Sequence, residues 1–439
     1  MLKAGFSRVD VTPSYGMYIA GYFHDRYAEE ILDPIYLNAI AISDGDDTAL
    51  IITADLLGMQ EQYLTPIRNK IAELVGIKPN NIIISSLHQH TSVRVPNNPG
   101  KDAFVDRTYF DMLDYKFCDA AKMAIADMSE ATLGLAEKET AEQIAFVRRY
   151  RMKDGSIKTN PSPAISGEIS HPIDDPDNTV RLLRFFREGK NDIALVNFST
   201  HPDVVGGSNI SADWPGFTRT YVEADHKDVS CILINGVQGD SNHFNPYREN
   251  RGVRKPNIEH AKYMGRVIAD AVSVIWDKTE PCDAVKINGA VDFTYQMIRT
   301  DGVEYYDECV EMVEALKKKM SVSADALERV GGAGGARRIV EMHTSSLFKK
   351  VAISAIGLGK INFVGFGGEP FTHYAKAVRE ALPEKYIIAL CCANGYDGYL
   401  PTEEALSNGG GYEANTSHFH PTIESDCVNM AVNIIKSFE

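Results

Sequence analysis

Side chains that can bind a metal ion or transfer a proton follow directly after several apolar segments of this sequence. In chain order, these are His88 and His90 after 81–87, His201 after 192–198, Asp240 after 231–234, Glu369 after 361–366, and Tyr396 and Tyr399 after 386–390. Short apolar runs of this kind are typical of buried strands, and ligands of α/β sheets bind at the carboxyl ends of the strands. The sequence therefore predicts one crevice lined by imidazole, carboxylate and phenol groups, which is typical of a metal-dependent hydrolase.

The two histidines at 88 and 90 are two residues apart at the end of one predicted strand. In a strand such residues point to the same face, ~6.6 Å apart, so both imidazoles can face one pocket. His88 and His90 alone are equally consistent with a polar strand end, but His201 and Glu369 add two further ligands. Catalytic zinc sites use three nitrogen or oxygen ligands and keep a position for water. An alternative stays open for Glu369, because the dipole of a predicted helix at 372–381 would also favour a carboxylate there.

Alternating helices and strands must position these side chains. Helical spacing of apolar residues predicts helices at 60–76 and 107–129, and 48–55 has the pattern of a buried strand. Such alternation predicts an α/β fold, in which a mixed β-sheet core is covered by helices. Because no linker or internal repeat interrupts the pattern, we expect a single domain spanning residues 1–439.

Two stretches depart from this alternation. Residues 152–179 are polar and proline-containing and predict a long loop, which in compact domains is often functional. Residues 302–345 predict a helical excursion on the main sheet, with helices at 304–320 and 321–329. The glycine-rich segment 331–336 predicts a flexible turn, since no strand precedes it and no Gly-Lys-Ser/Thr follows, as phosphate binding would require.

The composition favours a small-molecule enzyme in the cytoplasm. The net charge of −15 disfavours binding to nucleic acid or to an anionic membrane surface. No stretch reaches the ~18 apolar residues of a membrane helix, and the first ten residues lack the apolar core of a signal peptide. Seven cysteines, two of them adjacent at Cys391 and Cys392, disfavour a disulfide framework. We expect a small-molecule substrate and no stable membrane association, and the sequence leaves the oligomeric state open.

A series of short blocks resembles the N-terminal catalytic domain of the neutral/alkaline, non-lysosomal ceramidase family, in order and over nearly the whole chain. The blocks are GFSRVDVTP at 5–13, GY at 21–22, DPIY at 33–36, TADL at 53–56, HQHTS at 88–92, NFSTHP at 197–202, SADWPG at 211–216, GEPF at 368–371, NGYDGYLPT at 394–402 and YEA at 412–414. Their common order makes the resemblance specific.

The resemblance implies one zinc ion per chain, with four ligands: His88, His201, Glu369 and Tyr399. It implies that three further residues contact the scissile group of the substrate: His90, Arg148 and Tyr412. From spacing alone Tyr399 is typical of a core aromatic residue, because a phenol ionises near pH ~10. Arg148 lies in an arginine-rich segment that is also consistent with a solvated strand edge, although a guanidinium suits a polar substrate oxygen. Asp55 and Asp240 are candidates for orienting a metal-bound histidine, and either is equally suited to capping a helix.

Two features depart from the family pattern. The family has a serine, once proposed as a nucleophile, where this sequence has Asn242, and Ser241 is one position away. The sequence therefore favours attack by a metal-activated water over a serine nucleophile. The family also usually has a secretory signal and a C-terminal β-domain. Neither is recognisable here, so we expect a short, cytoplasmic, bacterial-type member.

These observations predict a zinc-dependent hydrolase that cleaves an amide bond in a small soluble molecule. His90 would transfer protons between the water and the leaving amine, while Arg148 and Tyr412 would stabilise the oxyanion. Ester or lactone hydrolysis at the same site is one alternative, and a non-catalytic metal-binding or sensor protein is another. His and Glu ligands would also accept manganese, iron or cobalt.

Overall fold

Two β-sheets form the centre of the computed structural model, which describes residues 1–22, 24–95, 105–247, 257–282, 286–318 and 320–438. In neighbour order the larger sheet contains β14 (Val229–Asn235), β12 (Asp192–Phe198), β11 (Thr179–Arg187), β6 (Ser129–Glu139), β1 (Lys3–Asp10), β3 (Tyr36–Ser43), β4 (Thr48–Ala54) and β5 (Ile82–Ser86), with β16 (Glu280–Cys282) paired to β6. The smaller sheet contains β17 (Ile287–Met297), β18 (Phe348–Leu358), β19 (Ile361–Phe366) and β21 (Tyr386–Leu390). Parallel pairs (β4–β5, β12–β14 and β19–β21) occur beside antiparallel ones, so both sheets are mixed.

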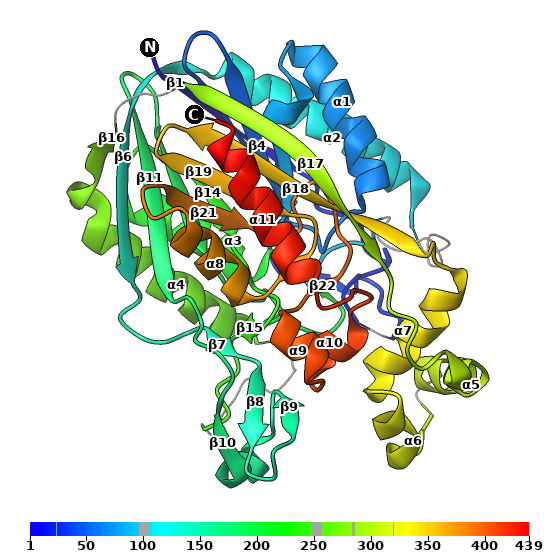
Figure 1. Ribbon diagram of the computed structural model, residues 1–439. Coiled ribbons are helices and arrows are strands. Elements are labelled where there is room, and N and C mark those ends of the chain that lie inside the picture. Colours follow the sequence, from blue (N-terminus) through cyan, green and yellow to red (C-terminus); the bar gives the residue numbers. More distant parts are fainter. Residues whose placement is uncertain (23, 96–104, 248–256, 283–285, 319, 439) are drawn as a thin grey trace.

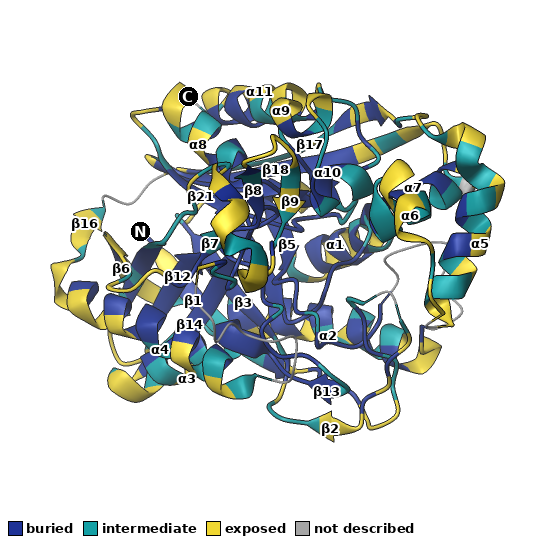
Figure 2. Cartoon of the chain, turned by 90° about the horizontal axis from the view of Figure 1, so that it is seen from below, coloured by how far each residue is buried: buried dark blue, intermediate teal, exposed yellow. Residues whose placement is uncertain are grey.

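The two sheets pack face to face, and helices cover their outer faces (Figure 1). Strand alternation explains the layers: Ile40 and Ile42 of β3 pack between the sheets with Phe363 of β19, whereas Ala39 and Ala41 face the helices. Figure 2 shows the buried residues concentrated in the strands and the exposed residues on the outer helices. The predicted α/β fold with a mixed sheet core is confirmed, whereas the single domain stays a prediction.

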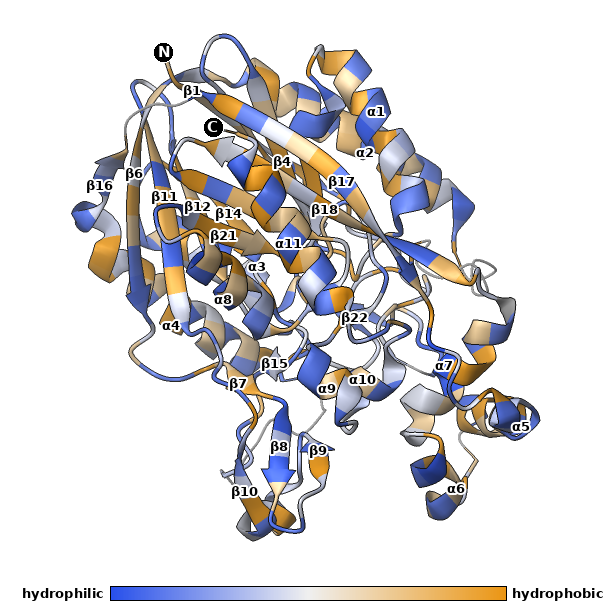
Figure 3. Cartoon of the chain, in the orientation of Figure 1, coloured by the Kyte–Doolittle hydropathy of each residue, from blue (hydrophilic) through white to orange (hydrophobic). Residues whose placement is uncertain are grey.

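Amphipathic helices form the two outer layers. The larger sheet is covered by α1 (Glu61–Val75), α2 (Arg107–Ala126), α3 (Asp213–Asp225) and α4 (Ile258–Ile275). The smaller sheet is covered by α8 (Thr372–Ala381) and α11 (Ile423–Lys436). Figure 3 shows hydrophilic and hydrophobic residues interleaved along α11, as expected for a helix with one face on a sheet and one in water. The helices predicted at 60–76 and 107–129 correspond to α1 and α2.

Short elements surround the strand ends. They are β2 (Glu30–Ile31), β7 (Phe146–Val147), β13 (Asn209–Ile210), β15 (Ser241–Asn242), β20 (Glu369–Pro370), β22 (Tyr399–Leu400), α9 (Glu403–Ser407), α10 (Tyr412–Thr416) and the 3-10 helices η1 (Pro79–Asn81) and η4 (Trp276–Lys278). Strand β20 pairs with β22 in parallel, with Glu369 directly opposite Tyr399. This pairing places two predicted ligands side by side.

The stretch predicted as a long loop is a small antiparallel sheet instead. It contains β8 (Arg149–Met152), β9 (Ile157–Thr159) and β10 (Ile169–Pro172), with the 3-10 helix η3 (Pro163–Glu168) before β10. Asp154 and Gly155 form the turn between β8 and β9: Gly155 has φ 85°, and the Asp154 carboxylate accepts from the Ser156 backbone N–H. Asp-Gly between two short strands is a hairpin signal, which the polar composition of the stretch obscured.

The predicted helical excursion is confirmed, but its glycine-rich segment is not a flexible turn. The region contains η5 (Val303–Tyr305), α5 (Tyr306–Lys317), α6 (Ala324–Arg329) and α7 (Gly332–Thr344). Most of the glycine-rich segment forms the first turn of α7. A Cβ on Gly334 would lie 2.2 Å from Thr416 Oγ1, so the glycine lets α7 approach α10 closely.

Within the described ranges, no helix has the length and apolar character needed to cross a membrane.

Candidate active site and metal centre

The predicted site residues converge where strands of both sheets end. His88 follows β5 and His201 follows β12 of the larger sheet, whereas Glu369 begins β20, just beyond β19 of the smaller sheet. His88 has φ 74°, a left-handed conformation that few residues other than glycine adopt. This turn ends the strand geometry at His88. The imidazoles of His88 and His90 therefore approach each other at their tips instead of standing parallel on one strand face.

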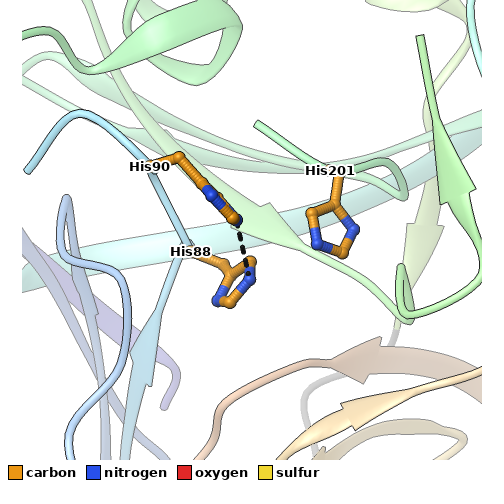
Figure 4. A group of neighbouring side chains, drawn as sticks. All are labelled: His88, His90 and His201. Carbon is orange, nitrogen blue, oxygen red and sulfur yellow. Dashed lines mark hydrogen bonds between the residues drawn. The ribbon is translucent and has the colours of Figure 1, made fainter. Parts of the chain in front are cut away.

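Three imidazoles form the core of the site (Figure 4). One nitrogen from each of His88, His90 and His201 lies within 4.8 Å of the other two. His88 Nε2 is 3.2 Å from His90 Nε2 and 3.2 Å from Glu369 Oε2. Glu369 Oε2 is also 3.3 Å from His201 Nε2. Direct contacts thus link four predicted site residues in a row: His90, His88, Glu369 and His201.

Backbone carbonyls fix the orientation of two of these imidazoles. His88 Nδ1 lies 2.7 Å from the Leu57 carbonyl oxygen, and His201 Nδ1 lies 2.9 Å from the Gln238 carbonyl oxygen. A carbonyl can only accept, so each Nδ1 carries the hydrogen and each Nε2 keeps its lone pair. Metal-binding histidines usually show this arrangement, because the second hydrogen bond fixes tautomer and ring orientation.

The geometry around Glu369 fits a bound cation. Glu369 Oε2 is buried and, among the described residues, has no hydrogen-bond donor of suitable geometry. It faces the lone pairs of His88 Nε2 and His201 Nε2, an arrangement that is repulsive unless a cation or a proton lies between them. Two neutral nitrogens and one carboxylate oxygen are a donor set that zinc prefers.

Two tyrosines adjoin the carboxylate. The Tyr396 hydroxyl donates to Glu369 Oε1 at 3.1 Å, which leaves Oε2 for the imidazoles. Tyr399 stacks its ring against His201, with centroids 6.2 Å apart. Burial raises the pKa of Tyr399 well above its ordinary value, so its phenol is neutral. The structure brings Tyr399 to the ligands, and its direct coordination of a metal stays a prediction. The sequence placed Tyr396 in the predicted crevice but predicted no particular contact for it.

Arg148 extends into the site from between β7 and β8. Its Nη1 lies 3.1 Å from Tyr399 Oη and 3.3 Å from His201 Nε2. The guanidinium carbon lies 5.8 Å from the centroid of the Tyr412 ring, the third predicted substrate-contacting residue. On its other side, Arg148 Nε is 2.9 Å from Glu413 Oε1. Burial opposes the charge, but the neighbouring Tyr399 and Glu413 keep the pKa of Arg148 above its usual range.

His90 lies on the more open side of the site. Its side chain is 13% exposed, compared with 2% for His88 and for His201. Burial still lowers the pKa of His90 to about 3, so the imidazole is neutral. His90 Nδ1 lies 3.9 Å from Asp203 Oδ1, which accepts a hydrogen bond of 2.7 Å from the Tyr22 hydroxyl. Sequence reasoning missed Asp203, although it is only two residues beyond a predicted ligand.

The two aspartates proposed to orient a histidine make other contacts. Asp55 forms a buried ion pair with Arg219, with Nη2 and Oδ2 2.6 Å apart, and accepts from Gln89 Nε2. Asp240 Oδ1 accepts from the backbone N–H and the hydroxyl of Thr372, at 2.8 Å each, where α8 begins. The Leu57 and Gln238 carbonyls occupy the place that the aspartates were expected to fill. Asp240 still adjoins the site, because its carbonyl accepts from the Arg148 backbone N–H.

The two packed sheets and the site at their strand ends define a neutral ceramidase-like fold. The solved structure of neutral ceramidase from Pseudomonas aeruginosa aligns with a TM-score of 0.73 and 13% identity, over 100% of this chain and 74% of that chain. A ceramidase complexed with C2 aligns with a TM-score of 0.71 and 13% identity, over 100% of this chain and 75% of that chain. The sequence matches no family model and no curated protein. The predicted resemblance is thus confirmed for the fold, and function must be argued from the site.

Proposed function

We propose that the protein is a zinc-dependent hydrolase that cleaves an amide bond in a small soluble molecule. The observation that carries the proposal is the buried Glu369 Oε2, which faces the Nε2 lone pairs of His88 and His201. These three residues, with Tyr399 as a fourth ligand, would hold one zinc ion. A bound zinc ion supplies a Lewis acid that polarises a carbonyl and lowers the pKa of a water molecule to ~7.

His90 is suited to transfer the proton. Its imidazole lies on the more exposed side of the site and directs Nε2 toward the other histidines. Nε2 would accept the proton of the attacking water and return it to the leaving amine. Asp203, facing Nδ1, would stabilise the imidazolium in between, and the Tyr22 hydroxyl fixes that carboxylate. A histidine base oriented by a carboxylate also occurs in other enzymes that catalyse acyl transfer.

Arg148 and Tyr412 are suited to stabilise the oxyanion. The guanidinium is a permanent charge in a site from which most water is excluded, where such charges act strongly. Burial raises the pKa of Tyr412 to about 12, so its hydroxyl stays protonated and can donate a hydrogen bond. The Tyr412 ring and the Arg148 guanidinium both adjoin the Tyr399 ring. Both donors therefore lie beside the proposed ligands.

A soluble substrate and a cytoplasmic location are part of the proposal. All seven cysteines are free, and six of the seven are buried, as is common in a reducing compartment. The net charge of −15 disfavours approach to an anionic membrane surface.

The test is a library of N-acyl amides and matched esters, assayed before and after zinc is removed with a chelator. We expect amide cleavage that is lost on chelation and restored by added zinc. Faster cleavage of the matched esters would replace the amidohydrolase with an esterase at the same site. Cleavage that persists without metal, or no cleavage by zinc-loaded protein, would contradict the proposal.

A further inference from the structure

A buried carboxylate lies behind the proposed oxyanion-stabilising arginine. Glu413 is 0% exposed and Arg148 is 8% exposed. Arg148 Nε and Glu413 Oε1 are 2.9 Å apart, so the two residues form a buried ion pair. Glu413 directly follows Tyr412 in the sequence, at the start of α10. One short helix thus carries both a proposed substrate contact and the partner of another.

The Glu413 carboxylate is itself fixed by the β8–β9 sheet. Its Oε2 accepts a hydrogen bond of 2.8 Å from the Thr159 hydroxyl of β9. The same Thr159 oxygen accepts from the Tyr412 backbone N–H at 2.8 Å. Gly411 has φ 86°, and a Cβ there would lie 3.1 Å from Thr159 Oγ1 and 3.4 Å from Glu413 Oε2. A glycine at this position therefore leaves room for the carboxylate and its anchor.

The other end of Arg148 is in contact with the proposed ligands. Its Nη1 is 3.3 Å from His201 Nε2, the nitrogen that must keep its lone pair for a metal. His201 Nε2 is in turn 3.3 Å from Glu369 Oε2, the nearest competing carboxylate along this path. A buried guanidinium is strongly destabilising unless a carboxylate pairs with it. Without Glu413, Glu369 would be the carboxylate that remains on this path for the Arg148 guanidinium to pair with.

We propose that Glu413 is a positioning residue, which fixes the Arg148 guanidinium in its place beside Tyr399 and Tyr412 and keeps it from pairing with Glu369. This inference rests on the proposed function. The Glu413 carboxylate is in contact with Arg148 and Thr159, so it acts on the site through Arg148. The Thr159 hydroxyl fixes the direction in which Glu413 holds the guanidinium.

The test uses Glu413→Gln, which keeps the shape and one acceptor oxygen but removes the charge. We expect kcat to fall by about 10- to 100-fold, as for other partners of site residues, with little change in KM. In an Arg148→Gln background the same substitution should have no further effect. Thr159→Val, which leaves the ion pair but removes its anchor, should give a smaller loss that also requires Arg148.

A matched control and a readout without substrate accompany these assays. Glu404→Gln removes a carboxylate 3.6 Å from the neighbouring Arg149 and should leave kcat unchanged. Zinc affinity, measured by chelator competition, should fall about tenfold in Glu413→Gln but not when Arg148 is already Gln. The absorption spectrum of the cobalt-substituted protein should shift in the same variants, and thermal unfolding shows that each is folded.

Equal losses with and without Arg148 would show that Glu413 has only a structural role. Unchanged kcat and zinc affinity in Glu413→Gln, with an active wild type, would overturn the inference and leave the proposed function intact. A wild type that binds no zinc and cleaves no amide would overturn both.

Discussion

The two sides of the site are held by different forces. On the ligand side, His88 and His201 are fixed by hydrogen bonds from Nδ1 to backbone carbonyls, and their side chains are 2% exposed. On the substrate side, His90 faces the Asp203 carboxylate, whose side chain is 29% exposed, and Arg148 is held by the carboxylate of Glu413. Backbone contacts suit a metal site, which needs one fixed geometry, whereas side-chain charges position the groups on the substrate side.

This difference predicts that the two sides can be damaged separately. Substitutions on the ligand side should remove zinc and activity together. Substitutions of His90 and Asp203 on the substrate side should lower activity and leave zinc bound.

The largest expected difference between the loss of activity and the loss of zinc comes from His90→Ala. Loss of a general acid–base group costs about 10²- to 10⁴-fold in kcat. The substitution leaves all four proposed zinc ligands in place. We expect zinc content equal to wild type and a kcat reduced by that factor. If His90→Ala instead loses zinc, His90 belongs to the ligand side and the division is wrong.

Asp203→Asn should give an intermediate effect. The amide keeps the shape but cannot balance the charge of a protonated His90, so we expect kcat to fall about tenfold with zinc retained. The loss should vanish in the His90→Ala background. Asp25→Asn is the control, since that carboxylate also accepts from a tyrosine hydroxyl, that of Tyr18, but at an exposed position. A loss of equal size in this control would remove the special role of Asp203.

The smallest effect is expected on the ligand side, from Tyr396→Phe. The substitution deletes the hydrogen bond to Glu369 Oε1 but leaves all proposed ligands, so zinc affinity should fall about tenfold or less. Once loaded with zinc, the variant should have nearly wild-type kcat. Tyr386→Phe, which removes a hydroxyl bonded to the surface carboxylate of Glu137, serves as the control. A Tyr396→Phe variant with normal affinity but low kcat would move Tyr396 to the substrate side.

The strand ends and their ligands could be predicted from sequence because both depend on local pattern. Apolar runs placed β5, β12 and β19 correctly, and the residues after them had to lie at a sheet edge. The left-handed backbone of His88 could not be predicted, since nothing in its neighbours requires it.

The contacts that hold the site residues in place could not be predicted from sequence patterns, for another reason. Glu413 meets Arg148, and Tyr396 meets Glu369, only after distant segments pack together. Backbone carbonyls such as those of Leu57 and Gln238 carry no sequence signal at all, because every residue has one. The sequence therefore offered Asp55 and Asp240 either as orienting groups or as helix caps, whereas main-chain oxygens orient the histidines and Asp240 caps α8.

The most direct test of the central claim is the metal content of protein purified without added metal or a histidine tag, measured beside His201→Ala. The account predicts about one zinc per chain in the wild type, as in catalytic zinc sites, and none in the variant. A wild type without metal that also takes up none on dialysis against zinc would contradict it, as would a variant that keeps its full zinc content.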